Sequence, residues 1–311
     1  MMGPAPSVRS FAPFAGPTRW LDTPRGRFAA LDFPGNVRAS GSDDSDPPQA
    51  APTVLLLHGF PDFPGNFTPL AHALASHGLH VVVPWLRGYA PSPTIGSFQL
   101  EDLAADVMAM ATSCAATAPM HIVGHDWGAV LTYAACALAP TQFATATTLA
   151  MPHPLAFVRS LLGRQAVRSW YMAALQTPGS NTWAKAGNFA FIDLLWRTWS
   201  PSFALDDNQR AALHACLAAS WPAPLAYYRN LIRPVPAALR RLRGPLAAPL
   251  HVPMLQLHGR NDGCIAPVTI DQRQYFAAGV QAQVFDDTGH FFPHELPQRC
   301  ADRIAAFIQS T

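Results

Sequence analysis

The 311-residue sequence predicts an α/β fold in which a mostly parallel sheet, flanked by helices, is interrupted by an all-helical insertion. Short continuous runs of apolar and β-branched residues alternate with helical segments. This is typical of parallel strands that are buried on both faces and joined by right-handed crossovers. From 152 to 236 no such run occurs, and Trp-, Tyr- and Phe-rich helical segments take its place. The apolar runs then resume, so the sheet is expected to continue after the insertion.

The first elements are expected to be a hairpin, followed by a strand, a helix and a second strand. TRWLDT and RFAALDF flank the turn PRG, which indicates two antiparallel strands. TVLLLHG (53–59) and LHVVV (79–83) are continuous apolar runs, and FTPLAHALASHG between them has helical periodicity and ends at a glycine. This order predicts two parallel strands joined by a crossover helix.

The alternation continues along the rest of the chain. A helix over 98–113 precedes the strand MHIVG (120–124), which is followed by another helix and by the strand TATTLAM (145–151). Beyond the insertion, the strands VPMLQLHG (252–259) and VQAQVFDD (280–287) are each expected to lead into a helix.

These patterns divide the chain into a core, a cap and a leader. Residues 18–151 and 237–311 form the predicted core, and residues 152–236 form a helical cap. The Pro-rich residues 1–17 are expected to be a mobile leader, and the polar segment 41–52 a surface loop.

Composition excludes several classes of protein. With 50% hydrophobic and 13% charged residues, the chain can bury a large core. The net charge is +2, and the basic residues are scattered apart from Arg240, Arg241 and Arg243, which argues against a nucleic-acid partner. The sequence shows neither a signal-peptide pattern nor an apolar run long enough for a membrane helix. We therefore expect a cytoplasmic protein without a membrane partner, and leave open whether it forms a homodimer.

The cysteines and histidines indicate no metal or cofactor. The five cysteines are odd in number and show no CxxC or Cys/His spacing, so neither a disulfide framework nor a zinc site is predicted. The twelve histidines are scattered without ligand spacing.

GHDWGA (124–129) places an acid where a strand turns sharply into a helix. Gly124 and Gly128 allow a tight, strained turn that lifts the side chain of Asp126 above the carboxyl edge of the sheet. A nucleophile placed there also lies at a helix N-terminus, where the N–H of Trp127 faces a developing oxyanion. The alternative is that Asp126 only caps the helix, which is a common role for aspartate.

Two later motifs favour the catalytic interpretation. HGRND places Asp262 just after a strand, and DDTGHFF places His290 in the loop after the last strand. Asp126, Asp262 and His290 thus follow the chain order of nucleophile, acid and base in α/β-hydrolases. His290 would be the base, and Asp262 would orient its imidazole. Asp286 and Asp287 are rival acids, but they are expected to finish a strand.

HGFPD (58–62) follows the first buried strand and supplies the second candidate donor of an oxyanion hole. The N–H of Phe60 is that donor, and Pro61 is a candidate for a cis peptide bond that shapes the turn. An ordinary turn at the end of a strand is compatible with the same pattern.

Taken in order, HGFP, LRGYAPS, GHDWGA, MPHP, HGRND and GHF resemble the α/β-hydrolases of the epoxide hydrolase branch over about 18–310. The resemblance implies an α/β-hydrolase fold and a small epoxide and water as substrates. It also implies attack by Asp126 on an alkyl carbon, giving an ester that water activated by His290 hydrolyses. A carboxylate suits this role because it is already ionised near neutral pH and needs no base for the first displacement.

The resemblance also implies that two tyrosines of the insertion assist ring opening. RSWYMAALQTPG and PLAYYRNLI match the two segments that carry such tyrosines, which indicates Tyr171 and Tyr228. A phenol is a suitable donor because it stays protonated at pH 7. Tyr227 would point elsewhere on a helix. The alternative for each tyrosine is a packed aromatic side chain.

Two other functions remain open. A haloalkane dehalogenase would share the triad and use the indole N–H of Trp127 to hold a halide, but such enzymes carry a polar donor where this chain has Phe60. A non-catalytic ligand-binding protein is disfavoured because no member of the triad is missing.

Overall fold

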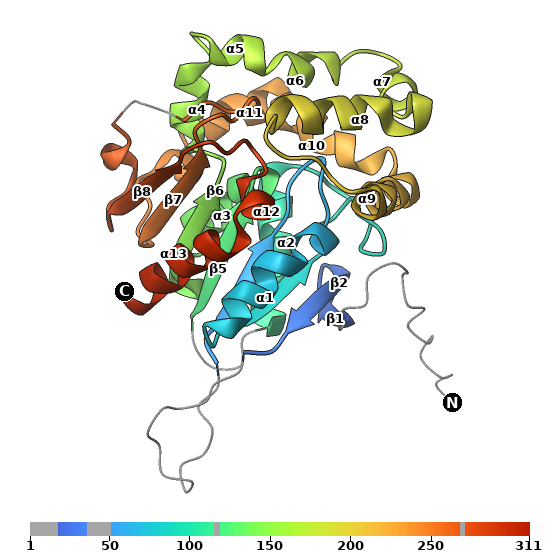
Figure 1. Cartoon of the computed structure of the whole chain (residues 1–311). Coiled ribbons are helices and arrows are strands. Elements are labelled where there is room, and N and C mark those ends of the chain that lie inside the picture. The colour runs from blue at the N-terminus through green and yellow to red at the C-terminus, as the bar shows by residue number, and fades with distance from the viewer. Residues whose placement is uncertain (1–17, 36–50, 115–118, 268–270) are drawn as a thin grey trace, which may run out of the picture.

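The computed structural model describes residues 18–35, 51–114, 119–267 and 271–311. Within them the chain forms one eight-stranded sheet in the order β1-β2-β4-β3-β5-β6-β7-β8 (Figure 1). β2 pairs antiparallel with β1 and β4, and all other neighbours are parallel. The strands are β1 (Thr18–Thr23), β2 (Gly26–Phe33), β3 (Thr53–Leu57), β4 (His80–Pro84), β5 (Met120–His125), β6 (Phe143–Leu149), β7 (Met254–Gly259) and β8 (Val280–Phe285).

Helices from both ends of the core cover the sheet. α1 (Thr68–Ser76) packs against α13 (Pro297–Gln309) in front of the sheet in Figure 1, and α2 (Leu100–Cys114) packs against α3 (Trp127–Leu138). The short α12 (Phe292–Glu295) precedes α13. The central strands are buried along almost their whole length because helices cover both faces of the sheet.

Only helices and loops occur between β6 and β7. They lie above the sheet at the top of Figure 1. In chain order they are α4 (Pro154–Ser160), α5 (Gln165–Arg168), α6 (Trp170–Ala174), α7 (Ser180–Trp183), α8 (Ala186–Trp199), α9 (Asp207–Ser220), α10 (Ala226–Ile232) and α11 (Val235–Arg241). Among the described residues, no helix is both long and apolar enough to cross a bilayer.

The sequence-based elements agree with this architecture, with three differences. The hairpin and the six later strands are present, displaced by up to two residues at their ends. No α-helix follows β7 among the described residues before β8, where only a short 3-10 turn, Arg273–Tyr275, occurs. The expected cap boundary at 236 falls inside α11, which continues to Arg241, because Pro234 starts a new helix there instead of ending the helical region. The strand expected over 280–287 ends at Phe285.

The predicted leader (1–17) and most of the predicted loop (41–52) lie outside the described residues.

The described core brings several loops together at one edge of the sheet. Because the carboxyl ends of parallel strands meet at one edge of a sheet, the loops after β3, β5, β7 and β8 converge beneath the inserted helices.

Candidate active site

The turn between β5 and α3 presents the side chain of Asp126. Its backbone has φ 52° and ψ −115°, outside the regions that ordinary residues adopt. Gly128 is required here because a Cβ would collide with the carbonyl oxygens of Leu57 and His58. The Asp126 side chain makes no capping hydrogen bond to α3. The helix-cap interpretation of this residue therefore lacks the bond that defines it.

The loop after β3 contacts the same carboxylate. The backbone N–H of Phe60 donates a hydrogen bond of 2.8 Å to Oδ1 of Asp126. The Phe60–Pro61 peptide bond is cis, as expected from the sequence. Trp127 is the first residue of α3, so its N–H is among those that have no acceptor within the helix. Both expected oxyanion donors thus lie beside Asp126.

Asp126, His290 and Asp262 form a buried chain of contacts. Nε2 of His290 lies 3.6 Å from Oδ2 of Asp126, and its Nδ1 lies 2.8 Å from Oδ2 of Asp262. The other Asp262 oxygen accepts the N–H groups of Cys264 and Ile265, each at 2.7 Å. These two bonds fix the carboxylate, which contacts Nδ1 of His290 and so directs Nε2, on the opposite edge of the imidazole, toward Asp126.

The rival acids are placed elsewhere. Asp286 is exposed and pairs with Arg260, and Asp287 is an exposed residue with φ 60° after β8. Neither makes a contact with His290 among the described residues, whereas Asp262 does.

Charge within this cluster strongly perturbs the imidazole. Burial alone would lower the pKa of His290, but the carboxylates of Asp262 and Asp126 outweigh burial and raise it to about 10. Burial would likewise raise the pKa of Asp262, and the neighbouring His290 and His258 instead hold it well below its usual value. His290 is therefore an imidazolium at pH 7 as long as both carboxylates are ionised.

The inserted helices also hold the loops that carry this cluster. The carbonyl oxygen of Trp199, the last residue of α8, accepts the N–H of His290 at 2.9 Å and the N–H of Gly263 at 3.0 Å. The hydroxyl of Ser200 accepts the N–H of Phe291 at 2.7 Å. One short segment of the insertion thus fixes both the loop after β7 and the loop after β8.

Tyr171 on α6 and Tyr228 on α10 lie across a cavity from Asp126. The cavity has a volume of about 320 Å³, and all three side chains line it. The two tyrosine rings pack edge to face with centroids 5.7 Å apart. Tyr227 points away from the cavity, as expected for its position on a helix, and donates its hydroxyl hydrogen to the carbonyl of Arg87 at 2.6 Å. Aliphatic and aromatic side chains form most of the remaining wall.

The two phenols are suited to donating a proton into this cavity. Burial raises the pKa of both Tyr171 and Tyr228 well above 10, so both remain protonated. The Tyr171 hydroxyl lies 3.3 Å from Sγ of Cys264. The buried Tyr228 hydroxyl lies near the side chains of Trp127 and Tyr171 but makes no hydrogen bond of normal geometry among the described residues. An unpaired buried hydroxyl is costly, and an acceptor atom of a ligand would satisfy it.

Sequence reasoning missed three contributors to the site. Cys264 contacts Tyr171, His258 lies 3.2 Å from Oδ2 of Asp262, and Trp199 supplies the carbonyl that anchors two loops. Position could have indicated His258, which lies one residue before the end of β7 and four residues before Asp262. No local pattern marks the other two, because their roles depend on contacts distant in sequence.

Potential metal ligands are few. In the described part of the chain, one group of three donors lies within 4.8 Å, formed by Asp126, Cys264 and His290. Two of these three residues belong to the Asp–His–Asp chain of contacts, and no ligand spacing in the sequence marks them.

Comparison with protein families places this arrangement in context. A model described as Alpha/beta hydrolase family matches residues 54–303. The chain is 25% identical to the Epoxide hydrolase of Caballeronia sordidicola over 300 residues, covering 84% of this chain and 88% of the relative. It is 33% identical to Epoxide hydrolase A of Mycobacterium tuberculosis over 139 residues, or 42% of each protein. A match to AB hydrolase superfamily protein YfhM of Bacillus subtilis, at 28% identity, spans about half of that relative.

Solved structures share the fold. An epoxide hydrolase of Bacillus megaterium in complex with an inhibitor superposes with a TM-score of 0.79 at 21% identity, covering 94% of this chain and all of that one. A putative epoxide hydrolase from Klebsiella pneumoniae gives a TM-score of 0.76 at 21% identity, covering 94% and 97%.

Proposed function

The chain belongs to the alpha/beta hydrolase family, and we propose that it is an epoxide hydrolase that converts an apolar epoxide to a vicinal diol. One observation carries the proposal: a carboxylate at the turn after β5 shares an apolar cavity with two protonated phenols from the insertion. In this proposal the inserted helices act as a cap that closes over the substrate. The curated relatives named epoxide hydrolases support the same reaction.

The first step of the proposed reaction forms an ester. A carboxylate oxygen of Asp126 attacks an epoxide carbon, and the ring C–O bond breaks with its electron pair going to the oxygen. Tyr171 and Tyr228 donate hydrogen bonds to that oxygen, which can take up a proton as its basicity rises. Because these donors act where charge develops, they stabilise the transition state more than the bound epoxide.

The second step returns the carboxylate. Esterification removes the negative charge of Asp126, one of the two charges that raise the pKa of His290. The imidazolium can then release its proton, which balances the proton gained by the alkoxide. Neutral His290 accepts a proton from water, whose oxygen attacks the ester carbonyl of Asp126. The N–H groups of Phe60 and Trp127 would stabilise the tetrahedral oxyanion. When the ester C–O bond then breaks, the leaving oxygen takes the proton of the added hydroxyl group, which releases the diol and returns Asp126 as a carboxylate.

Isotope labelling tests the covalent route. In a single turnover of styrene oxide with excess enzyme in ¹⁸O water, the diol should contain only unlabelled oxygen, and the label should enter the Asp126 carboxylate. Label in that first diol would show that water attacks the epoxide directly. Release of bromide from 1-bromobutane faster than opening of any epoxide would favour the haloalkane dehalogenase reaction instead.

A further inference from the structure

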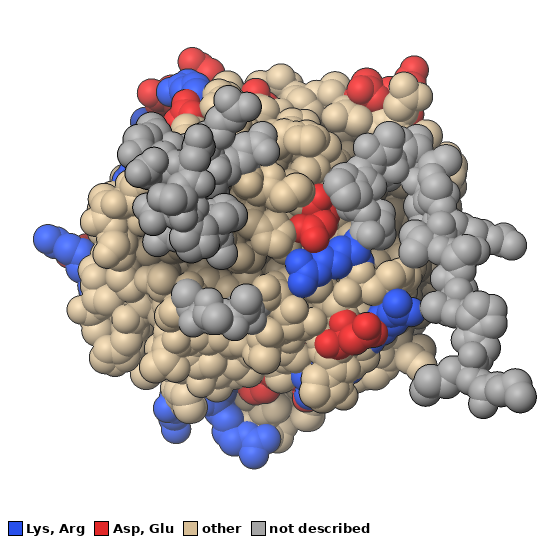
Figure 2. All heavy atoms as spheres, turned by 90° about the horizontal axis from the view of Figure 1, so that it is seen from below, with Lys and Arg blue, Asp and Glu red and all other residues tan. Residues whose placement is uncertain are grey.

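The inserted helices carry a charge opposite to that of the rest of the chain. Residues 152–250 contain eleven Lys and Arg, three Asp and no Glu, a net charge of +8. The remaining residues contain ten Lys and Arg against sixteen Asp and Glu, a net charge of −6. The overall charge of +2 conceals this separation. On the face opposite the insertion, basic and acidic side chains are interspersed (Figure 2).

Exposed apolar side chains concentrate on the same helices. Among the described residues, twelve large apolar side chains are exposed, and nine of them lie between 152 and 250. The most exposed is Leu162, at 94%. The nine are Val158, Leu162, Val167, Trp170, Leu194, Ile232, Val235, Leu239 and Leu242. The region with the positive charge is therefore also the region with the apolar surface.

Part of this apolar surface belongs to the wall of the active-site cavity. Val158, Ile232, Leu239 and Leu242 are exposed, and the same four side chains line the cavity that contains Asp126. α4 contributes the first of them, and α10, α11 and the residue after α11 contribute the others. The apolar interior of the cavity is thus continuous with an apolar outer surface.

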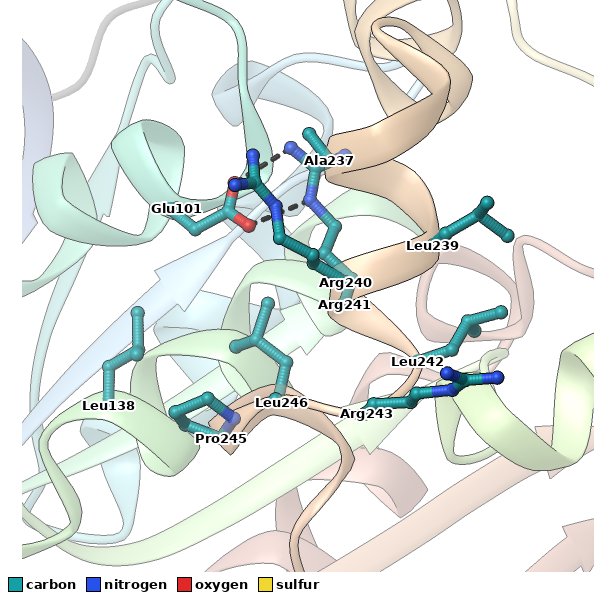
Figure 3. A pocket seen from close by; sticks show the side chains of 11 residues that line it. Glu101, Leu138, Ala237, Leu239, Arg240, Arg241, Leu242, Arg243, Pro245 and Leu246 are labelled. Carbon is teal, nitrogen blue, oxygen red and sulfur yellow. Dashed lines mark hydrogen bonds and ion pairs between the residues drawn. The ribbon is translucent and has the colours of Figure 1, made fainter.

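A second hollow of about 790 Å³ is lined by residues of α11 and of the segment after it, including two exposed arginines. Leu239 and Leu242 line both hollows, so α11 forms a wall between them. Figure 3 shows Arg241 directed to Glu101, with which it forms a two-pronged ion pair at 2.7 and 2.8 Å. Arg240 and Arg243 are exposed and form no ion pair within the described part of the chain. We call these two arginines, with Leu162, Val235 and Leu239, the mouth face.

We propose that the mouth face docks the protein on an anionic lipid bilayer, from which apolar epoxides enter the cavity. The inference rests on the proposed function. Exposed apolar side chains interspersed with unpaired cations are the pattern that binds anionic lipid interfaces, and such binding needs no membrane-spanning segment. The sequence predicts no membrane partner because it lacks a spanning segment, a criterion that does not cover docking at the interface.

The positive charge of the insertion also favours a bilayer over a second copy of the chain as the partner of the mouth face. Two copies of an insertion with a charge of +8 repel each other, so a second copy of the chain is a poor partner for this face. An acidic protein would pair with the arginines of the mouth face. It would, however, cover the route by which substrate enters the cavity with a protein surface. A bilayer satisfies the cations, covers the apolar side chains and also dissolves apolar substrates.

Vesicle flotation of the full chain tests the proposal. We expect binding to phosphatidylcholine vesicles that contain phosphatidylglycerol and little binding to phosphatidylcholine alone. Each neutralised cation should lower partitioning about fivefold, so Arg240→Gln/Arg243→Gln should lower it ~25-fold. Leu162→Ser/Val235→Ser should lower it about tenfold or more. Matched controls on the core, Arg299→Gln/Arg303→Gln and Ile95→Ser, should leave binding within about twofold.

Several outcomes would overturn the docking proposal. These are absence of binding to the anionic vesicles, equal binding to both vesicle types, and equal losses in the mouth-face and core variants. Binding to soluble polyglutamate without vesicle binding would identify an acidic protein partner instead. A dimer that Leu162→Ser/Val235→Ser dissociates would identify a second copy. None of the substituted side chains lines the active-site cavity, so hydrolysis of dissolved styrene oxide by these variants tests the proposed function separately.

Discussion

The sheet core and the inserted helices bury different kinds of polar group. In the core, Asp62 is buried against His294, Asp106 against Arg87, and Asp262 against His290. None of the three aspartates of the insertion is buried, and apart from Arg241, which is paired with Glu101, its contribution to the cavity wall is phenolic and apolar. Full negative charges can be held in the core because strand ends and adjacent loops supply several N–H donors and cations at fixed positions.

The different polar groups of the core and the insertion suit different tasks in the proposed reaction. The core holds groups that must change charge during the proposed reaction, and the insertion presents neutral donors and an apolar wall that selects the substrate. The separation is incomplete, because the carbonyl of Trp199 in the insertion holds the loops of Asp262 and His290. Substitutions in each region should therefore affect different steps, with the largest effects in the core.

Replacing the base of the core should stop the reaction after its first step. In His290→Gln, Asp126 keeps its carboxylate and can still form the ester, but no group accepts a proton from water. Steady-state turnover should fall by at least ~10⁴, and intact-mass spectrometry should show protein plus one substrate. The conservative Asn variant of Asp126 should show no adduct at early times. Normal turnover of His290→Gln without an adduct would assign the base to another residue.

Replacing the phenols of the insertion should slow the other step. Tyr171→Phe and Tyr228→Phe each keep the ring packing and remove one donor, so ester formation should slow by ~10² to 10⁴ in each. One phenol can partly replace the other, so the double variant should lose nearly all ester formation, measured before the steady state. Tyr227→Phe is the matched control, because its hydroxyl binds the Arg87 carbonyl outside the cavity. Unchanged ester formation in the double variant would remove the phenols from the mechanism.

The charge of His290 should also appear in the pH dependence of stability. Its pKa is raised from 6.5 to about 10 in the folded chain, so the stabilisation is fully present below about pH 6.5. It is lost as the pH rises through about 10, because the imidazolium loses its proton. The free energy of unfolding should fall over this range, by on the order of 1 to 3 kcal/mol more in the parent than in His290→Gln. Denaturant titrations of both proteins measure the difference, and parallel curves would contradict it.

The ion pair that joins the two regions should have the smallest effect. Glu101→Gln leaves the mostly buried Arg241 without its carboxylate, although Arg241 keeps bonds to Gln99 and to two backbone carbonyls. Because Glu101 is partly exposed, the loss should be about 1 kcal/mol in unfolding free energy. Asp286→Asn, which breaks an exposed pair with Arg260, should cost less than about 0.5 kcal/mol. Equal costs would mean that the pair does not help to hold α11.

The sequence was most informative where local pattern determines structure. Three features could be predicted because each depends on residues that are close in the chain: the buried strands, the GxDxG turn, and the order of Asp126, Asp262 and His290. The helix expected after β7 is absent from the described residues between β7 and β8, because whether that segment forms a helix depends on how distant segments pack against it. The role of Trp199 could not be predicted from the sequence either, because its backbone carbonyl, rather than its side chain, accepts the hydrogen bonds of two loops that are distant in the chain.

The carbonyl of Trp199 has a consequence for how the protein loses activity on heating. It accepts hydrogen bonds from the loops that follow two different strands, so those loops keep their spacing only while α8 is in place. The insertion is built from many short helices, whereas the sheet is a continuous hydrogen-bonded unit. Partial unfolding should therefore release the insertion first. Inactivation should then occur at a lower temperature than the loss of β-sheet circular dichroism, with an intermediate that retains its sheet and has lost its catalytic geometry.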